Sequence, residues 1–457
     1  MKLVYNVKDK PKFPQLLVFA LQQLLAIMTA TLVVPIITGH GMSPAAALFG
    51  AGIGTIVYVL FTKAKSPVFL GSSFAFLGSM ASAFAGGVSM ELGYLGLIIG
   101  ATFAGLVYVV IAIIVKCAGV NWLNKLMPTA VIGSTVTVIG LSLAGNAVSD
   151  MVKGNVTKDN VMVGSPLIAL VCALVTLFVV ILCSVYGKKM MKLIPFVLGI
   201  GAGYVTAAIF TVIGNVADVD ALKILNFSVF ESLLVDGKVA FSTFFSVPDF
   251  TFLTAFKGTG ELNGAYIAKI AVAYIPVAFV VFAEHIADHK NISTIIEKDL
   301  LEDPGLHRTL LGDGVGSIAG AFFGGCPNTT YGESVGCVAI TGNASVVTII
   351  AAAIGAMLIA FISPFVALVN SIPSCVMGGV CLALYGFIAV SGLKMVQKVD
   401  LEDNKNLFVV STILICGIGG LAVTFGQVTI TSIATALIIG IIVNQMLGGS
   451  KAEKNSK

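Results

Sequence analysis

Two acidic residues lie in apolar surroundings, where a charged side chain needs a reason to be present. Glu284 lies in the run Val280-Val-Phe-Ala-Glu-His-Ile286, and Glu333 follows the stretch Pro327-Asn-Thr-Thr-Tyr-Gly332. An ionisable group inside a membrane-spanning segment is by default a candidate functional residue. Such a carboxyl can take a proton on one side of a membrane and release it on the other. It can also switch between donating and accepting a hydrogen bond toward a polar solute. The alternative is structural: His285 or a backbone N–H satisfies Glu284, and Glu333 caps its helix.

Two further carboxylates lie between Glu284 and Glu333 in the sequence. Asp288 lies four residues after Glu284 and therefore on the same helix face. It either extends a proton path toward the cytoplasm or marks the point where the helix reaches water. Asp313, in Leu311-Gly-Asp-Gly314, is either an N-terminal helix carboxylate or part of a relay.

The histidines give no sign of a metal centre. His40, His285 and His307 are isolated from other ligand types at metal-binding spacing, and we expect them at the membrane interface. We therefore expect no metal and no cofactor.

The composition indicates which kind of protein must hold these residues. Of 457 residues, 57% are hydrophobic and 11% are charged, whereas soluble domains carry about 25% charged residues. This composition indicates a polytopic membrane protein. The net charge of +4 is too small to suggest a nucleic-acid partner. No Walker A motif, Ser/His/Asp set or zinc signature occurs, so neither ATP-driven transport by this chain nor an enzyme is expected. Most of the 8 cysteines lie in apolar runs and are expected to pack rather than to form disulfides.

Fourteen apolar runs approach the length of about 20 residues that a spanning helix needs. A polar stretch, 215–263, separates seven runs from the other seven, and the sequence assigns it no role. The runs lie near 15–38, 45–62, 68–85, 92–115, 123–146, 162–186, 193–214, 264–288, 310–325, 333–344, 346–369, 372–393, 406–422 and 427–448.

The positive charges orient these spans. With the N-terminus in the cytoplasm, twenty of the 26 lysine and arginine residues fall on the cytoplasmic side, which is the expected bias. This asymmetry predicts fourteen spans of the cytoplasmic membrane with both termini inside. The six residues left outside are Lys153, Lys158, Lys223, Lys238, Lys257 and Lys269.

Seven spans per half make the second half cross in the opposite sense, which is an inverted repeat. Matching interruptions occur in the third and tenth spans, where 66–74 and 326–333 precede short helical runs. Non-helical chain at membrane depth must satisfy its backbone groups. The two extended pieces are therefore expected to pair, and the following half-helices to direct N–H groups at a ligand. The alternative is two Pro/Gly kinks in ordinary helices.

At these stretches the chain resembles the nucleobase–ascorbate transporter family (nucleobase–cation symporter 2), and most closely its bacterial uracil permease branch. The resemblance runs from about 12 to 448 and is densest over 284–342. The stretches that carry it are Gly71-Ser-Ser-Phe-Ala-Phe76, Glu284-His-Ile286, Asp299-Leu-Leu-Glu-Asp-Pro-Gly305, Leu311-Gly-Asp-Gly314, Pro327-Asn-Thr-Thr-Tyr-Gly-Glu333, Glu333-Ser-Val-Gly336 and Thr341-Gly342.

The resemblance implies an all-α fold of fourteen spans in a seven-plus-seven inverted repeat, with short strands in the broken third and tenth spans. Spans 1–4 (15–117) and 8–11 (264–369) would form a core domain. Spans 5–7 (122–214) and 12–14 (370–448) would form a gate domain, and 215–263 would be an extracellular loop. The family often works as a dimer, so a homodimer in membrane lipid is also implied.

The resemblance also implies the roles of site residues. Glu284 would hydrogen-bond one edge of a nucleobase and Glu333 the opposite edge. Proton coupling would fall to Glu284, Glu333 and Asp288. The other substrate-binding residues would be Ser73, the backbone amides of Phe74 and Gly332, the Phe74 and Tyr331 rings, and Ala30.

The expected function is import of uracil with protons by alternating access. A glutamate at position 333 is similar to the uracil branch, whereas the purine branch usually has glutamine there. The alternatives are a purine-base (xanthine or uric acid type) proton symporter and an uncoupled nucleobase facilitator whose carboxylates are structural. An anion exchanger on this fold is disfavoured, because Glu333 lies where an anion would need positive charge.

Three positions depart from the family pattern. Ser334 stands where asparagine is usual, and Gln22-Gln23 stands where the family usually has Gln-His. Asp288 stands where uracil permeases tend to have histidine. Two of these changes remove a histidine associated with the site, so we expect proton coupling to be arranged differently or the substrate to differ.

Overall fold

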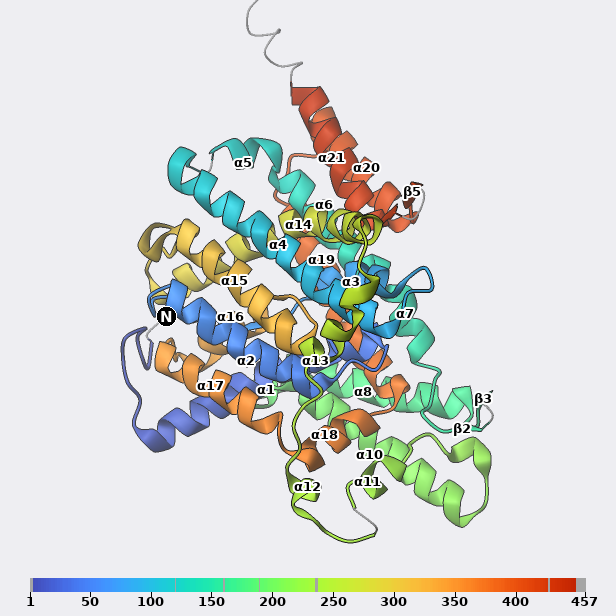
Figure 1. The fold of residues 1–457 in the computed structure, drawn as a ribbon. Coiled ribbons are helices and arrows are strands. Elements are labelled where there is room, and N and C mark those ends of the chain that lie inside the picture. The colour runs from blue at the N-terminus through green and yellow to red at the C-terminus, as the bar shows by residue number, and fades with distance from the viewer. Residues whose placement is uncertain are drawn as a thin grey trace, which may run out of the picture.

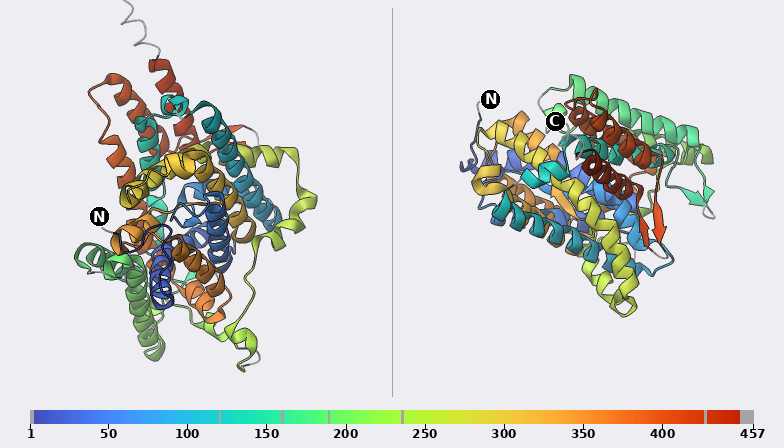
Figure 2. Two further views of the ribbon diagram at one scale, coloured as in Figure 1. Left: turned by 90° about the vertical axis from the view of Figure 1, so that its left-hand side faces the viewer. Right: turned by 90° about the horizontal axis from the view of Figure 1, so that it is seen from above.

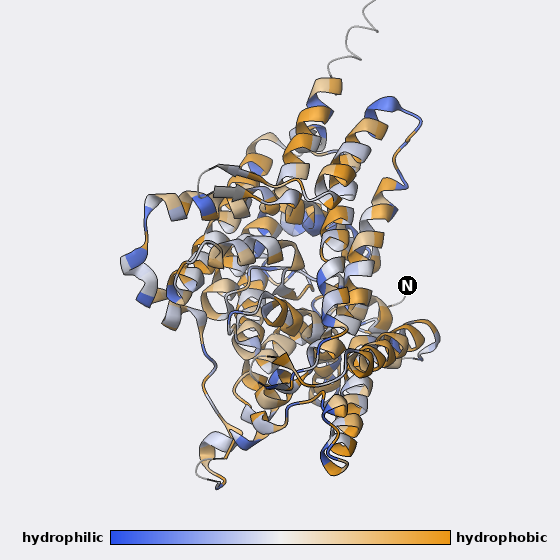
Figure 3. Cartoon of the chain, turned by 90° about the vertical axis from the view of Figure 1, so that its right-hand side faces the viewer, coloured by the Kyte–Doolittle hydropathy of each residue, from blue (hydrophilic) through white to orange (hydrophobic). Residues whose placement is uncertain are grey.

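The computed structural model describes residues 3–119, 121–158, 161–188, 190–234, 237–425 and 428–448. Within these residues, eight helical segments are long and apolar enough to cross a membrane, and shorter apolar helices accompany them. The hydrophobic residues follow the helices and the hydrophilic ones gather at their ends and turns (Figure 3). The chain is therefore a largely helical, multi-pass membrane protein. Lys2, Lys189, Lys451, Lys454 and Lys457, which were assigned to the cytoplasmic side, lie outside the described residues.

The elements fall into long helices, shorter helices and short strands (Figure 1). The long segments are α1 (Phe13–Thr38), α2 (Pro44–Phe61), α4 (Met90–Ala118), α6 (Thr129–Ser142) with α7 (Ala144–Asp150), α8 (Pro166–Tyr186), α10 (Pro195–Val216), α14 (Gly264–Ile296) and α19 (Ser374–Val396). The shorter helices are η1 (Phe74–Phe76), α3 (Leu77–Phe84), α5 (Asn121–Leu126), α9 (Met190–Leu193), η2 (Asp220–Leu222), α11 (Ser228–Glu231), α12 (Phe241–Phe244), α13 (Thr251–Ala255), η3 (Phe256–Glu261), η4 (Leu301–Gly305), α15 (Leu306–Gly324), α16 (Gly332–Thr341), α17 (Val346–Ile359), α18 (Ser363–Ser371), α20 (Asn404–Ile418) and α21 (Ser432–Gly448). The strands are β1 (Leu70–Ser72), β2 (Thr157–Lys158), β3 (Val161–Met162), β4 (Asn328–Thr330), β5 (Val423–Phe425) and β6 (Val428–Ile430).

The helices form two packed groups (Figures 1 and 2). In the first, α15 packs against α2 and α4, α17 against α1 and α2, and α14 against α4. In the second, α19 packs against α6 and α8, α10 against α8, and α20 against α6 and α21. Elements from the two halves of the chain therefore interleave in both groups.

Glycines allow α15 to approach its neighbours closely. A Cβ atom added at Gly54 of α2 would lie 2.7 Å from the Gly316 carbonyl oxygen, and one added at Gly316 would lie 2.7 Å from the Gly54 carbonyl oxygen. On the other side, a Cβ at Gly314 would lie 2.9 Å from the carbonyl oxygen of Gly105 in α4. Since lipid supplies no hydrophobic force between helices, such close backbone contacts are what hold them together.

Three predicted spans are interrupted. The run 123–146 is divided into α5, α6 and α7, and the break between α5 and α6 falls at Pro128, which has no N–H and disfavours a helical residue before it. The run 346–369 is divided into α17 and α18, and Pro364 begins the second helix. In the run 427–448, the described residues begin with β6 (Val428–Ile430), which pairs with β5, so the helix starts only at Ser432.

The structure also has strands outside the third and tenth spans, which the sequence did not predict. β2–β3 and β5–β6 form two further short hairpins. Val423 and Thr424 are β-branched and follow the helix-ending pair Gly419-Gly420, which favours extended chain over a continued helix.

The long stretch 215–263 is held by aromatic packing. Its α13 and η3 pack against α4. The Phe252 ring stacks on the Phe322 ring of α15, with ring centroids 4.8 Å apart. Phe250 contacts Phe49 of α2 at 4.9 Å. This gives the stretch a structural role that the sequence did not indicate: it joins the end of α10 to the start of α14 while fixed to the first group of helices.

We predict that Gly316→Ala lowers stability by about 1–3 kcal/mol, because the added methyl group forces the α2 backbone away. Thermal unfolding of the purified protein in detergent measures the effect. Gly145→Ala in α7 is the matched control, since nothing lies within 4 Å of a Cβ there; it should be neutral or slightly stabilising. Equal unfolding temperatures for the two variants would contradict the close α2–α15 packing.

Candidate functional site

The two interrupted segments pair with each other. β1 and β4 are antiparallel, with Leu70 opposite Thr330 and Ser72 opposite Asn328. The ladder continues at both ends, where Ser73 N–H donates to the Pro327 carbonyl at 2.9 Å and Tyr331 N–H to the Phe69 carbonyl at 3.2 Å. The predicted pairing of the extended pieces is thus confirmed. It satisfies backbone groups that would otherwise be unpaired at membrane depth.

Side chains fix this strand pair to the surrounding helices. Thr55 Oγ1 of α2 accepts from Leu70 N–H at 2.9 Å, and Asn328 Nδ2 donates to the Gly50 carbonyl at 3.1 Å. The Tyr331 hydroxyl donates to the Ser72 carbonyl at 2.7 Å. A side chain at Gly71 would collide with the Tyr331 ring, which is why a glycine is needed there.

The half-helices begin where the strands end. η1 and α3 follow Ser73, and α16 begins at Gly332. The first N–H groups of a helix have no acceptor within it. The start of α16 therefore offers N–H donors and a partial positive charge next to the carboxylate of Glu333.

A cavity of about 440 Å³ lies at these helix starts. Seven of the eight predicted site residues line it: Ser73, Phe74, Glu284, Asp288, Tyr331, Gly332 and Glu333. The eighth, Ala30, is buried in an apolar cluster. Among the described residues of α1, Ala26 lines the cavity instead, one turn before Ala30.

The three carboxylates differ in their surroundings. The Glu284 side chain is exposed to the cavity, and Glu333 is half-buried at the start of α16. Asp288 is buried, and its Oδ2 accepts a hydrogen bond from Thr330 Oγ1 at 2.9 Å. Asp288 therefore does not mark the point where α14 reaches water; the helix continues to Ile296.

The second group of helices supplies the opposite wall of the cavity. It is mostly apolar, and the Phe74 ring meets the Tyr385 ring edge-on, with centroids 6.0 Å apart. Sequence analysis missed this wall, because apolar residues within apolar helices carry no local signal. Its residues include Val136, Ile139, Phe196, Leu384 and Ile388.

The cavity extends toward one end of the helices. Along α14 its lining continues from Glu284 to Asn291, which is about 10 Å of helix. Along α19 the lining reaches Ser391 and Met395, and Lys192 also contributes. This end carries the positive charges that were assigned to the cytoplasm.

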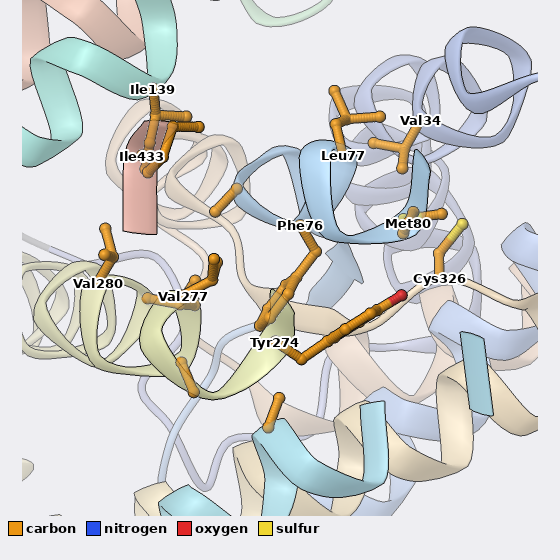
Figure 4. Close-up of a cluster of buried hydrophobic side chains, with 14 of the residues drawn as sticks. Val34, Phe76, Leu77, Met80, Ile139, Tyr274, Val277, Val280, Cys326 and Ile433 are labelled. Atoms are coloured by element: carbon orange, nitrogen blue, oxygen red, sulfur yellow. The ribbon is translucent and has the colours of Figure 1, made fainter. Parts of the chain in front are cut away.

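An apolar cluster adjoins the cavity, since Ile139 belongs to both (Figure 4). Phe76 stacks on Tyr274 of α14 with ring centroids 5.5 Å apart. Figure 4 shows Ile139 and Ile433 of the second group lying together, facing the side of the cluster that Val277 and Val280 form.

A buried polar network lies behind the site. His285 Nδ1 lies 2.6 Å from Asp313 Oδ2, and His285 Nε2 lies 2.9 Å from Thr309 Oγ1. His289 Nε2 lies 2.6 Å from the Tyr58 hydroxyl. The expectation that His285 is interfacial was wrong, because it is 1% exposed and joins α14 to α15.

Asp313 is likewise not at a helix N-terminus. α15 begins at Leu306, and Asp313 is fully buried two turns into it. The other expectation for Asp313, that it forms part of a relay, stays a prediction.

Lys65 and Asp303 join the α2–β1 connection to the α14–α15 connection at the side assigned to the cytoplasm. Lys65 Nζ donates to Asp303 Oδ1 at 2.5 Å, and this hydrogen bond lowers the pKa of the exposed carboxyl below its usual value. Exposed ion pairs contribute little to stability. The contact therefore matters chiefly for showing that the α2–β1 and α14–α15 connections lie on the same side.

Two departures from the family pattern meet in the structure. The Gln23 side-chain amide of α1 donates to Ser334 Oγ of α16, and Ser334 Oγ also accepts from Phe69 N–H at 2.9 Å. Both side chains are buried. Gln23 and Ser334 therefore form one hydrogen-bonded unit that holds α1, α16 and the start of β1 together.

The comparisons with known proteins identify the class of protein. A family model described as "Permease family" matches residues 14–426. The chain belongs to this permease family, and the resemblance seen in its sequence is confirmed. It is a membrane transporter and not an enzyme.

Similar proteins are known over nearly the full length. The uracil permease of Bacillus caldolyticus is 37% identical over 452 residues, covering 98% of this chain and 95% of that protein. The uracil permease of Escherichia coli (strain K12) is 34% identical over 438 residues, covering 95% and 92%.

Solved structures share the fold at low sequence identity. The transmembrane domain of the cyanobacterial bicarbonate transporter BicA matches with a TM-score of 0.62 and 14% identity, covering 96% of this chain and 98% of that one. The murine anion transporter Slc26a9 matches with a TM-score of 0.64 and 12% identity, and the match covers 97% of this chain and 69% of that one. At such identities the likeness concerns the fold alone.

We predict that the Gln23–Ser334 contact is energetically coupled. Gln23→Met, Ser334→Ala and the double variant complete a double-mutant cycle, read by thermal unfolding in detergent. Ser334→Ala leaves a buried N–H and a buried amide without their acceptor. The losses of stability in the two single variants should therefore exceed the loss in the double variant by about 0.5–3 kcal/mol. Strictly additive losses would mean that the two side chains act independently.

Proposed function

We propose that this chain is a uracil importer of the cytoplasmic membrane, coupled to protons and working by alternating access. The observation that carries the proposal is one cavity in which Glu284, Glu333 and the start of α16 lie together. The nearly full-length similarity to proteins named uracil permease supports the choice of substrate.

The cavity offers groups that match a uracil ring. Uracil presents two ring N–H donors and two carbonyl acceptors. Each of the Glu284 and Glu333 carboxyl groups accepts from a ring N–H, and in its protonated form it also donates its O–H to a ring carbonyl. The backbone N–H groups of Phe74 and Gly332 donate to the carbonyls, and the Phe74 and Tyr331 rings provide apolar contact surfaces for the base. Ser73 lies at the same edge of the cavity.

Proton coupling follows from sharing one cavity. Protonation of Glu284 or Glu333 on the outside favours uracil binding, and deprotonation on the inside favours release. Each ligand then raises the affinity for the other, as thermodynamic linkage requires. Asp288, one helical turn from Glu284 and bonded to Thr330, is the third proton-accepting group in this proposal.

Contacts between distant segments support fourteen spans in a seven-plus-seven arrangement. Ends assigned to the cytoplasm meet: Val4 N–H donates to the Gly342 carbonyl at 2.8 Å, and Asn444 Nδ2 to the Lys125 carbonyl at 3.1 Å. Ends assigned to the outside also meet, since Ser374 N–H donates to Asn155 Oδ1 at 3.0 Å. A wrong span count would place such partners on opposite sides.

In this proposal the two packed groups are the core and the gate that the family resemblance implies. The core is formed by 15–117 and 264–369, and the gate by 122–214 and 370–448, with 215–263 as the outer connection. Lys192 and Asn291 line the cavity at the side assigned to the cytoplasm, and we take this side as its opening in an inward-open state. Rocking of the core against the gate would expose the site to the outside. A homodimer remains an expectation of the family.

Two other functions use the same cavity. A purine-base symporter calls for a wider space around Phe74 and Tyr331. An uncoupled facilitator would leave the carboxylates structural, and uptake would then not follow the proton gradient. The experiment below separates both from the proposal.

We predict that proteoliposomes accumulate labelled uracil above equilibrium only under an imposed inward proton gradient. A glutamine amide keeps hydrogen-bonding atoms but cannot take up or release a proton, so Glu284→Gln and Glu333→Gln should each abolish the gradient-driven accumulation of uracil. Glu261→Gln, on the exposed outer connection, is the matched control and should behave as the wild type.

Unlabelled 5-fluorouracil, thymine and xanthine are the competitors in this assay. Competition by xanthine alone favours the purine symporter. Equilibration of uracil without accumulation favours the facilitator. Absence of uracil flux through folded protein would overturn the substrate assignment.

The inward-open state predicts sided access to the cavity. In a background lacking Cys117 and Cys337, Ser391→Cys should react with a membrane-impermeant thiol reagent only from the cytoplasmic side, and uracil should protect it. Ser246→Cys, on the exposed outer connection, should react only from outside. Reaction of Ser391→Cys from outside alone would contradict the proposed orientation.

A further inference from the structure

A second cavity lies between α1 and α10, away from the substrate site. It measures about 300 Å³ and is bounded by α18 and the start of α19. None of its described lining residues lines the substrate cavity. We call it the α1–α10 crevice, defined on its two long sides by Met28–Ile36 and Val197–Val205.

The crevice has almost no polar surface. Apart from Thr29 and Tyr204, its lining consists of glycine and aliphatic, aromatic and methionine side chains. The Tyr204 hydroxyl is already engaged, at 2.8 Å from Ser371 Oγ. A polar solute such as a nucleobase would lose its hydrogen bonds to water there without replacement. The chemistry of the crevice therefore fits an apolar occupant.

The crevice is continuous with the apolar outer surface of the spanning helices. Val205 of α10 and Leu368 of α18 line it and are 56% and 44% exposed. The exposed apolar face of α10 continues along Ile209 and Val212. In a bilayer this surface faces hydrocarbon, so a lipid chain can enter the crevice without crossing water.

We propose that the α1–α10 crevice binds an acyl chain of a membrane phospholipid. The chain gains close contacts with side chains on several sides, whereas on an open helix face it contacts protein on one side only. The binding is therefore stronger than ordinary contact with surrounding lipid.

The position of the crevice gives the lipid a consequence, which rests on the proposed function. α1 belongs to the proposed core and α10 to the proposed gate. A chain between them makes contacts that depend on their separation, so it favours the inward-open arrangement over any state that closes the crevice.

A photoreactive phospholipid tests the binding directly. The protein is reconstituted with a lipid carrying a diazirine in its acyl chain, irradiated, and digested for mass spectrometry. We expect labelling of 28–36 and 197–205 several-fold above that of the lipid-exposed face of α8, where Phe178 and Leu182 are 55% and 53% exposed. Equal labelling of the crevice and of α8 would overturn the proposal.

Filling the crevice provides the matched variant. Gly201 lines it, and nothing lies within 4 Å of a Cβ at that position, so Gly201→Phe places a ring in the space without a backbone clash. Crevice labelling should fall to the level of α8 in Gly201→Phe and stay unchanged in Gly145→Phe, whose site is equally open. Unchanged labelling in Gly201→Phe would overturn the proposal.

Competition on the wild type tests the same point without a variant. Unlabelled phospholipid should displace crevice labelling saturably, while α8 labelling only dilutes in proportion; proportional dilution at both places would overturn the proposal. Because labelling needs no uracil, its result tests lipid binding independently of the transport assay. In that assay, Gly201→Phe should change the rate of uracil exchange several-fold without changing uracil affinity.

Discussion

The hydrogen-bonded pairing of β1 with β4 is the constraint on which the rest of the structure depends. Three residues from each half of the chain leave the helical conformation at membrane depth, where no water is present to satisfy their backbone groups. They can do so only against each other, and this requires α2, α14 and α15 to hold both segments in register. The starts of α3 and α16 are fixed by the same pairing, and with them the place where a ligand meets backbone N–H groups.

The site combines this hydrogen-bonded, rigid half with a second half that is mostly apolar. The carboxylates, the strand pair and the buried histidine network all belong to the first group of helices, whereas α6, α10 and α19 contribute a mostly apolar wall. Such a wall can slide or separate without breaking hydrogen bonds, which suits the movement that the proposed alternating access requires. The polar half is tied by Gln23, Ser334 and Asn328 and is expected to move as one body.

The departures from the family pattern become intelligible in this setting. Gln23 and Ser334 are distant in sequence but contact each other, so a change at one alters the requirement at the other. Asp288 retains a polar partner in Thr330, next to the start of α16. The site thus keeps a connected set of hydrogen bonds with different side chains, and the likeness to anion transporters at 12–14% identity concerns the scaffold rather than this chemistry.

The sequence by itself determined the membrane class, most helices and the paired interruptions. Of the eight site residues that it predicted, seven line the cavity. These follow from local signals: apolar length, Pro/Gly breaks and carboxylates in apolar runs. It did not reveal the helix breaks near Pro128, the partners of His285 and Asp313, or Ala26 in place of Ala30. Nor did it reveal the apolar wall and the α1–α10 crevice. Only the tertiary structure decided these, because burial, hydrogen-bond partners and cavities arise where segments hundreds of residues apart pack together, and no single segment encodes that meeting.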